Sequence, residues 1–201
     1  GKGGHGAYPH TAVDAIPPAA ALILALQNVA ARETDPLESV VLTIGTIRGG
    51  YRNNVIADEV EMSGTLRAFD PAIRDALEAR IRRIADGIAA AYGATAGVRV
   101  VRGYPPVEND ARLAEAFARY LREHSRIRVE RMMPTMGGED FAYFAQRIAG
   151  LQVRLGIRNE RAGAVHPGHS PEFRIDENAL AVGVETLAAF ARAAGSGAIG
   201  G

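Results

Sequence analysis

Apolar residues along the first half of the chain follow two different periods. Where they recur every three or four residues the pattern predicts a helix, and where they alternate with polar residues or form a short β-branched run it predicts a strand. Five elements are predicted in the order helix, strand, strand, helix, strand: 14–34, 40–47, 59–67, 70–93 and 98–104. Within 59–67 the alternation places Val60, Met62 and Leu66 on one face. We therefore expect a sheet with one buried face.

This order is one strand short of a βαββαβ ferredoxin-like sandwich, in which two helices cover one face of an antiparallel sheet. The missing strand would precede Gly1. The predicted fold class of residues 1–108 is therefore α+β, a ferredoxin-like sandwich lacking its first strand. Asp14 stands at the start of the first predicted helix, where a short acidic side chain can accept hydrogen bonds from free backbone N–H groups, and the second helix starts at Asp70-Pro71. Gly93 suits the end of the second helix.

A second unit is predicted from residue 109 onward, after the Pro105-Pro106 pair. Its elements are expected in the order helix, strand, short helix, strand, helix: 111–123, 127–132, a helix after the MGGEDF loop, 151–157 and 177–194. Two strands in about ninety residues make a thin core. We therefore expect 109–201 to be the C-terminal part of a larger α/β domain.

Composition and charge narrow the classes of function. The chain has 201 residues, 47% of them hydrophobic, and 23 basic residues balance 23 acidic ones. No block of positive charge could follow a phosphate backbone, so nucleic acid is not an expected partner. No apolar run approaches the roughly 20 residues of a membrane span, so no membrane partner is expected and a cytoplasmic location is the default. Because the chain has no cysteine, any metal would need histidine and carboxylate ligands.

Polar residues that could carry chemistry concentrate in three loops: GGHGAYPH at 3–10, MGGEDF at 136–141 and HPGHSPEF at 166–173. The glycines around His5 leave its imidazole room to meet a ligand. Each of the other loops also has a simpler interpretation. Glu139 and Asp140 suit the positive end of a following helix, and His166 and His169 can be ordinary surface histidines. On residue chemistry alone these alternatives stay open.

The chain resembles the aminoacylase and hippurate hydrolase family of metal-dependent amidohydrolases in six segments: GKGGHGAYPH, LQNVAARETDP, NNVIADEVEMSGTLRAF, YPPVEND, GGEDF and HSPEF. That family includes the auxin-conjugate hydrolases and, more distantly, zinc carboxypeptidases. Its members have a two-metal catalytic domain interrupted by a lid domain that forms the dimer interface. The resemblance implies that 1–108 is the lid/dimerisation domain and 109–201 the C-terminal part of the zinc-peptidase catalytic domain. The family's N-terminal catalytic half, with its general-base glutamate, has no counterpart here.

The resemblance also assigns roles to individual residues. His169 matches the last metal ligand of the family, and a neutral imidazole is a suitable ligand for Zn, Mn, Co or Ni. His5 matches the lid histidine that crosses the dimer interface and stabilises the oxyanion of the partner's tetrahedral intermediate. Asn54 and Arg67 match lid residues that bind the substrate carboxylate, which suits the guanidinium fork of arginine. Without the resemblance, alternation would make Arg67 an ordinary polar-face strand residue.

Gly138 and Glu139 match a loop that lies beside the substrate, so they are expected to be substrate-binding residues. Asp140 is expected to cap the following helix. His10 is assigned no chemical role. His166 can contact a metal ligand without binding the metal itself, or can be an ordinary surface residue.

Hydrolysis of the amide bond in an N-acyl amino acid, or a similar small conjugate, is the activity that the resemblance implies. The protein would bind a divalent metal pair and form a homodimer through the lid. The 201 residues alone are expected to be inactive, because most metal ligands and the general base would lie elsewhere. One alternative is a non-catalytic dimerisation or small-molecule-binding module derived from this family. Another is that a companion chain supplies the N-terminal half.

Overall fold

The computed structural model describes residues 1–199. The chain divides into two compact units, Gly1–Pro106 and Val107–Gly201. The fold is mixed α/β: both units contain helices, and the first also contains the strands.

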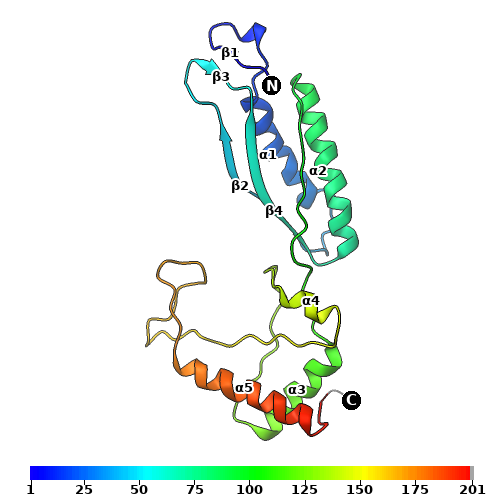
Figure 1. Cartoon of the computed structure of the whole chain (residues 1–201), viewed down its shortest axis with the longest axis vertical. Helices are drawn as coiled ribbons and strands as arrows, with labels where there is room; N and C mark the ends of the chain where they lie inside the picture. The colour runs from blue at the N-terminus through cyan, green and yellow to red at the C-terminus, as the bar shows by residue number, and fades with distance from the viewer. Residues whose placement is uncertain (200–201) are drawn as a thin grey trace. The chain divides into compact units, whose positions relative to one another are not determined.

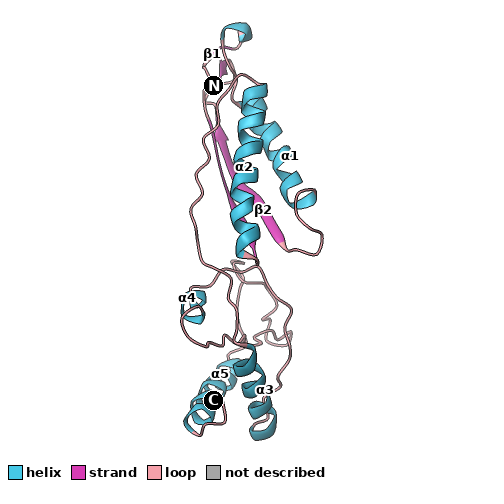
Figure 2. Ribbon diagram, turned by 90° about the vertical axis from the view of Figure 1, so that its right-hand side faces the viewer, coloured by secondary structure: helices cyan, strands magenta, loops and turns pink. Residues whose placement is uncertain are grey.

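The first unit is built on a two-stranded antiparallel sheet. Its elements are β1 (Gly4–His5), η1 (Pro9–Thr11), α1 (Ile16–Ala31), β2 (Val40–Gly49), β3 (Val55–Ile56), β4 (Val60–Ala68) and α2 (Pro71–Ala91). In the main sheet Val40 lies opposite Ala68 and Gly49 lies opposite Val60. The short strands β1 and β3 form a separate antiparallel pair. Both views show α1 and α2 side by side against β2 and β4 (Figures 1 and 2).

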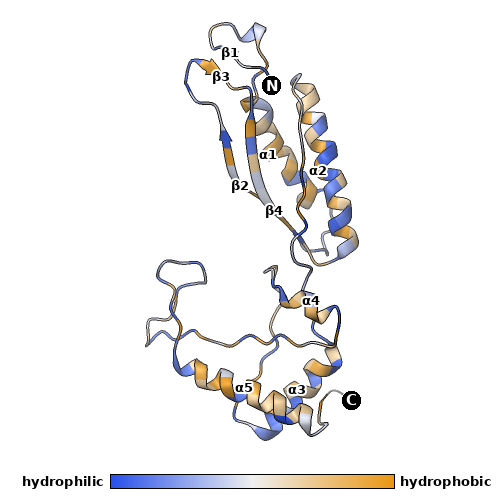
Figure 3. Cartoon of the chain, viewed as in Figure 1, coloured by the Kyte–Doolittle hydropathy of each residue, from blue (hydrophilic) through white to orange (hydrophobic). Residues whose placement is uncertain are grey.

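The core of the first unit lies between the two helices and the sheet. Leu26 and Val29 of α1, Ala68 of β4 and Leu77 of α2 are buried there. The partly buried residues packed around them include alternate positions of the strands: Val40, Leu42, Ile44 and Leu66. Figure 3 shows charged and apolar residues alternating along α2, as its amphipathic pattern requires. The predicted sheet with one buried face is therefore confirmed.

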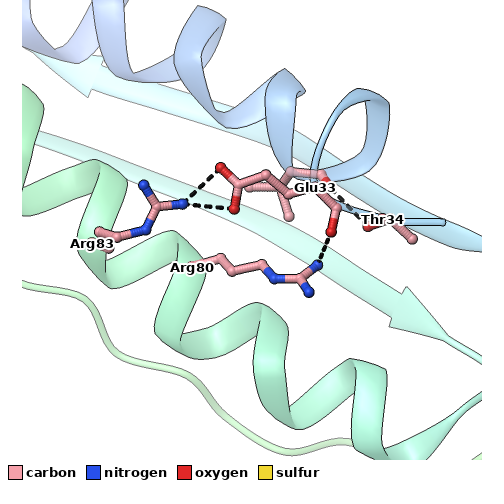
Figure 4. A network of polar contacts seen from close by, with 5 residues as sticks. Glu33, Thr34, Arg80 and Arg83 are labelled. Atoms are coloured by element: carbon pink, nitrogen blue, oxygen red, sulfur yellow. Dashed lines mark hydrogen bonds and ion pairs between the residues drawn. The ribbon is translucent and has the colours of Figure 1, made fainter.

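A polar network joins the end of α1 to α2 (Figure 4). Nη2 of Arg83 donates to both carboxylate oxygens of Glu33, at 2.7 and 2.6 Å. Nη1 of Arg80 donates to the Glu33 backbone carbonyl. The Thr34 hydroxyl donates to the Val29 carbonyl at 2.7 Å, which satisfies one of the carbonyls that the helix end leaves without a partner.

The predicted helix boundaries of this unit hold to within a few residues. The second helix starts at Asp70-Pro71 as predicted, and the Asp70 carboxylate caps α2 by accepting hydrogen bonds from the N–H groups of Ala72 and Ile73. Gly93 has a φ of +68°, a conformation that glycine adopts without strain at the end of a helix. The first helix stops at Ala31 rather than at 34.

Residues 98–104 do not form the predicted strand. They run beside α2 (Figure 1), where Nη1 of Arg82 donates to the Val98 carbonyl at 2.6 Å and Arg102 pairs with Asp75 at 2.8 Å. A strand needs a neighbouring backbone to satisfy its N–H and C=O groups, and side chains of α2 take part of that role here.

The second unit contains α3 (Ala111–His124), α4 (Phe141–Ala145) and α5 (Asn178–Gly195). Its core is formed where α3 meets α5 and the residues after it: Phe117, Leu121, Ala189, Ala193 and Ile199. The rings of Phe117 and Phe190 meet edge to face, with centroids 5.0 Å apart. All three predicted helices of this unit are confirmed.

The two predicted strands of this unit, 127–132 and 151–157, are wrong: neither range is paired as a strand. Instead, the Asn109 side chain binds both backbone groups of Gln152, donating to its carbonyl at 2.9 Å and accepting from its N–H at 2.8 Å. A side-chain amide thus replaces the neighbouring strand at this point. In the described part of the chain, no helix is long and apolar enough to cross a membrane.

Candidate functional site

The loop that carries His5 is held against the 54–56 segment by a short ladder. His5 lies opposite Val55, and Gly4 lies opposite Ile56. The Gly6 N–H then donates to the Asn54 carbonyl at 2.8 Å. The structure therefore brings together two of the predicted site residues, His5 and Asn54, although they lie about fifty positions apart in the sequence.

The hydrogen bonding of the His5 ring defines what the ring can do. Its Nδ1 lies 3.1 Å from the Ala7 backbone N–H, which can only donate, so Nδ1 is the acceptor. In the neutral imidazole the proton then sits on Nε2, which makes Nε2 a hydrogen-bond donor. The Tyr8 ring stands beside it, with centroids 5.6 Å apart, and His5 itself is exposed. His5 is therefore suited to donate to a negatively charged oxygen.

Arg67 lies at the end of the first unit that is opposite to His5 and Asn54. It is opposite Val41, one position from the end of the β2–β4 ladder, whereas β1 and β3 lie beyond the Val60 end. Seven residues of extended chain separate Val60 from Arg67, or about 23 Å. Within one chain, Arg67 and Asn54 therefore cannot bind the same carboxylate.

In the second unit, Gly138 and Glu139 lie just before Asp140, the N-cap residue of α4. Glu139 is half-buried, and its backbone carbonyl accepts from the Ala142 N–H at 3.3 Å. Asp140 occupies the N-cap position, but its side chain makes no capping hydrogen bond. The prediction that Asp140 caps this helix is therefore wrong: its backbone is in the helical region, with φ −70° and ψ −22°, whereas a capping residue usually has an extended backbone.

His169 projects from a loop between α4 and α5 and is exposed. Its φ is +68°, the one positive value among the described non-glycine residues. This backbone conformation is unfavourable for histidine unless neighbouring contacts hold it. His166 and Glu172, which lie three residues before and after His169, form a side-chain contact with 3.1 Å between Nε2 and Oε2. The pair spans the turn that presents His169.

Asn159 and Asp176 form a second contact at the base of this loop, and sequence reasoning missed both. Nδ2 of Asn159 donates to Oδ2 of Asp176 at 2.7 Å. The pKa of Asp176 is lowered, first by this hydrogen bond and then by one from the Asn178 backbone, and partial burial opposes them. An Asp two residues before a helix is a sequence signal that could have indicated this contact.

The described residues do not gather the ligands of a complete metal site. Within residues 1–199, no three His, Asp or Glu side chains gather as a metal site. His169 fits the role of one ligand because it is an exposed imidazole on a held loop. The residues described here do not complete a metal pair.

Comparison with known proteins decides the family. The model of peptidase family M20/M25/M40 matches residues 4–193. The chain belongs to this family. Membership in the M20/M25/M40 family agrees with the resemblance to metal-dependent hydrolases at the level of the family.

Two curated members of the M20/M25/M40 family illustrate the similarity. An N-acetyldiaminopimelate deacetylase from Leuconostoc citreum is 42% identical over 191 residues, which are 94% of this chain and 48% of that protein. Thermostable carboxypeptidase 2 from Saccharolobus solfataricus is 37% identical over 184 residues, 91% of this chain and 46% of that protein. The chain spans about half the length of these relatives. Their names indicate deacetylases and carboxypeptidases, not the hippurate hydrolases that the motifs suggested.

Two solved structures are also similar to this chain. A protein from methicillin-resistant Staphylococcus aureus, described as an aminohydrolase, has a TM-score of 0.74 and 35% identity over 94% of this chain and 49% of its own. A dinuclear metal-binding peptidase of the M20 family from Bacillus subtilis has a TM-score of 0.68 and 32% identity over 89% of this chain and 46% of its own.

Proposed function

We propose that this chain forms the lid and the C-terminal catalytic part of a metal-dependent amidohydrolase that acts on small N-acyl amino acids. In this proposal the first unit, Gly1–Pro106, is the ferredoxin-like lid and dimerisation domain. The second unit completes a catalytic domain. Its other part supplies the general base and most metal ligands.

The pairing of His5 with Asn54 is the observation that carries this proposal. The β1–β3 ladder fixes the two residues at one end of the lid, and the Ala7 N–H orients the His5 ring so that Nε2 is the donor. A donor of this kind can stabilise the oxyanion that forms when water adds to an amide carbonyl. The Asn54 amide can bind a neighbouring polar group of the same substrate.

The position of Arg67 supports a site shared between two chains. Arg67 lies about 23 Å along β4 from the Val60 end, so it cannot reach a substrate held by His5 of its own chain. A two-fold dimer with antiparallel lids would bring Arg67 of one protomer to the His5 end of its partner. Arg67 would then bind the substrate carboxylate through its guanidinium group, while His5 and Asn54 of the partner act on the other side.

The metal pair belongs to the whole protein in this proposal. His169 would supply one imidazole ligand to a divalent metal (Zn, Mn, Co or Ni), and such a metal would make a bound water more acidic, toward neutral pH. Glu139 and Gly138, ahead of α4, would line the substrate site. Since residues 1–199 offer no cluster of three metal ligands, we expect the 201-residue chain alone not to hydrolyse substrate.

The relatives favour N-acetyl amino acids as the first substrates to test, because the Leuconostoc citreum relative is named a deacetylase. The test compares the whole protein on an N-acetyl amino acid and on its C-terminal amide, which lacks the carboxylate. We expect wild type to prefer the free acid, Arg67→Ala to lose this preference, and a chelator to abolish activity. Equal rates on acid and amide in wild type would contradict the role of Arg67. Activity that survives chelation would contradict the metal-dependent mechanism.

A further inference from the structure

The His169 loop of the second unit begins after Ile157 and ends at Asp176. The Asp176 N–H donates to the Ile157 carbonyl at 3.0 Å, so the two ends of the loop meet. Two side-chain contacts then close the loop, one near its tip and one at its base. They differ in exposure and in the number of hydrogen bonds that they make.

The contact near the tip joins the side chains of His166 and Glu172. Their side chains are 40% and 67% exposed. Exposed ion pairs contribute little, because water and salt screen the charges and both side chains lose freedom. This contact alone does not account for the positive φ of His169.

The contact at the base uses nearly every polar atom of two partly buried side chains. Oδ2 of Asp176 accepts from Asn159 at 2.7 Å, and Oδ1 accepts from the backbone and side-chain N–H groups of Asn178, at 3.1 and 2.9 Å. The backbone of Asn159 exchanges hydrogen bonds of 3.0 and 2.9 Å with Ala164, which is 2% exposed. This base contact thereby ties the start of the loop to the start of α5.

Asn159 can make this contact in only one orientation. Its Oδ1 accepts from the N–H groups of Arg161 and Ala162, at 3.0 and 3.4 Å, so its Nδ2 must face Asp176. Asp176 must in turn be an acceptor on both oxygens. The lowered pKa of Asp176 agrees with a carboxylate that receives several donors.

We propose that Asn159 and Asp176 are positioning residues that hold His169 in place for a metal ion. The positive φ of His169 belongs to a turn that the Ser170 N–H closes by donating to the Pro167 carbonyl at 3.2 Å, and the fixed base of the loop sets where this turn stands. This inference rests on the proposed role of His169 as a metal ligand. Residues bonded directly to a metal ligand typically change metal affinity by about 10- to 100-fold when they are replaced, and residues that act through the loop are expected at the low end of that range.

The test uses the whole protein and four variants. Asp176→Asn turns one acceptor into a donor, and Asn159→Asp places two carboxylates face to face. The double variant Asn159→Asp/Asp176→Asn reverses donor and acceptor and so restores the hydrogen bond. Glu172→Ala, which removes only the tip contact, is the matched control. Hydrogen exchange of residues 160–175 and zinc affinity, measured by competition with a chelator, are the two readouts.

We expect each single variant to raise loop exchange and to lower zinc affinity by about tenfold or more. The double variant should restore both, and Glu172→Ala should change both by less than the base variants do. The inference would be overturned if the single variants showed the same hydrogen-exchange rates in the loop as wild type. It would also be overturned if loop exchange rose in these variants while their zinc affinity stayed unchanged.

A further variant, His169→Ala, separates this inference from the proposed function. If His169→Ala weakens zinc binding and the base variants do not, only the positioning role fails. If His169→Ala leaves zinc affinity unchanged, the assignment of His169 as a ligand fails and the positioning role fails with it.

Discussion

Gly64 of β4 lies so close to Thr43 of β2 that a Cβ on Gly64 would stand 2.1 Å from the Thr43 carbonyl oxygen. The obstacle is backbone, which cannot rotate away as a side chain would. Gly64 also faces Ile44, next to the register shift between Ile44 and Thr46. We expect Gly64→Ala to lower the free energy of unfolding by about 3 kcal/mol, because the two strands must separate. Urea unfolding measures this directly.

Gly87 offers a matched control for the same substitution. It lies on the exposed side of α2, and nothing stands within 4 Å of a Cβ built there. Gly87→Ala is therefore expected to raise the free energy of unfolding by about 0.5–1 kcal/mol, since alanine favours the helix. Equal changes in the two variants would contradict the close approach of β2 and β4.

The network around Glu33 allows the stability contribution of a surface ion pair to be compared with that of a hydrogen bond to the backbone. The Arg83 side chain is 64% exposed, so Arg83→Ala is expected to lower the free energy of unfolding by less than about 1 kcal/mol. Arg80 is half-buried and donates to the Glu33 carbonyl. Arg80→Ala leaves that carbonyl without its donor and is expected to lower the free energy by about 1–3 kcal/mol. A larger loss from Arg83→Ala would contradict this ranking.

The helices could be predicted from the sequence because their signals are local. Asp70 and Asp110 cap α2 and α3 within one turn, and the apolar spacing needs only the helix itself. The strands predicted at 98–104, 127–132 and 151–157 did not form, because their signal is not sufficient. An apolar pattern indicates where a strand can form, but a strand also needs a partner backbone, and the pattern does not contain one.

The candidate site shows the same limit. The motifs indicated His5, Asn54 and Arg67 individually, but they did not indicate how far apart the three residues lie. His5 and Asn54 meet through strands of two residues each, which are too short to give a periodic pattern. The separation of Arg67 from both follows from the register of β2 and β4, which only the structure provides.

The lowered pKa of Asp176 predicts how acid affects the second unit. Its carboxyl group has a pKa below the ordinary value of 3.8 because Asn159 and Asn178 donate to the ionised form. Ionised Asp176 therefore stabilises the fold above about pH 4, and this contribution is lost as the pH falls through its lowered pKa. Unfolding measured from pH 6 to pH 2 should show the stability difference between wild type and Asp176→Asn shrinking with acid. A constant difference would contradict the prediction.

The shared active site is the central claim, and mixed dimers test it. His5→Ala and Arg67→Ala should each lower kcat strongly, by about 100-fold or more for the loss of an oxyanion donor. Refolding the two variants together gives half mixed dimers by chance. If His5 and Arg67 meet from different chains, each mixed dimer has one intact site of two, so about a quarter of wild-type activity returns.

The matched control mixes His5→Ala with Asn54→Ala. These two residues lie at the same end of one chain, so every mixed dimer lacks one of them at each site and no activity should return. The decisive measurement is therefore the activity of the His5→Ala and Arg67→Ala mixture. Recovery to about a quarter of wild type, with none in the control mixture, is the predicted result. No recovery in either mixture, or recovery in both, would contradict a site shared between two chains.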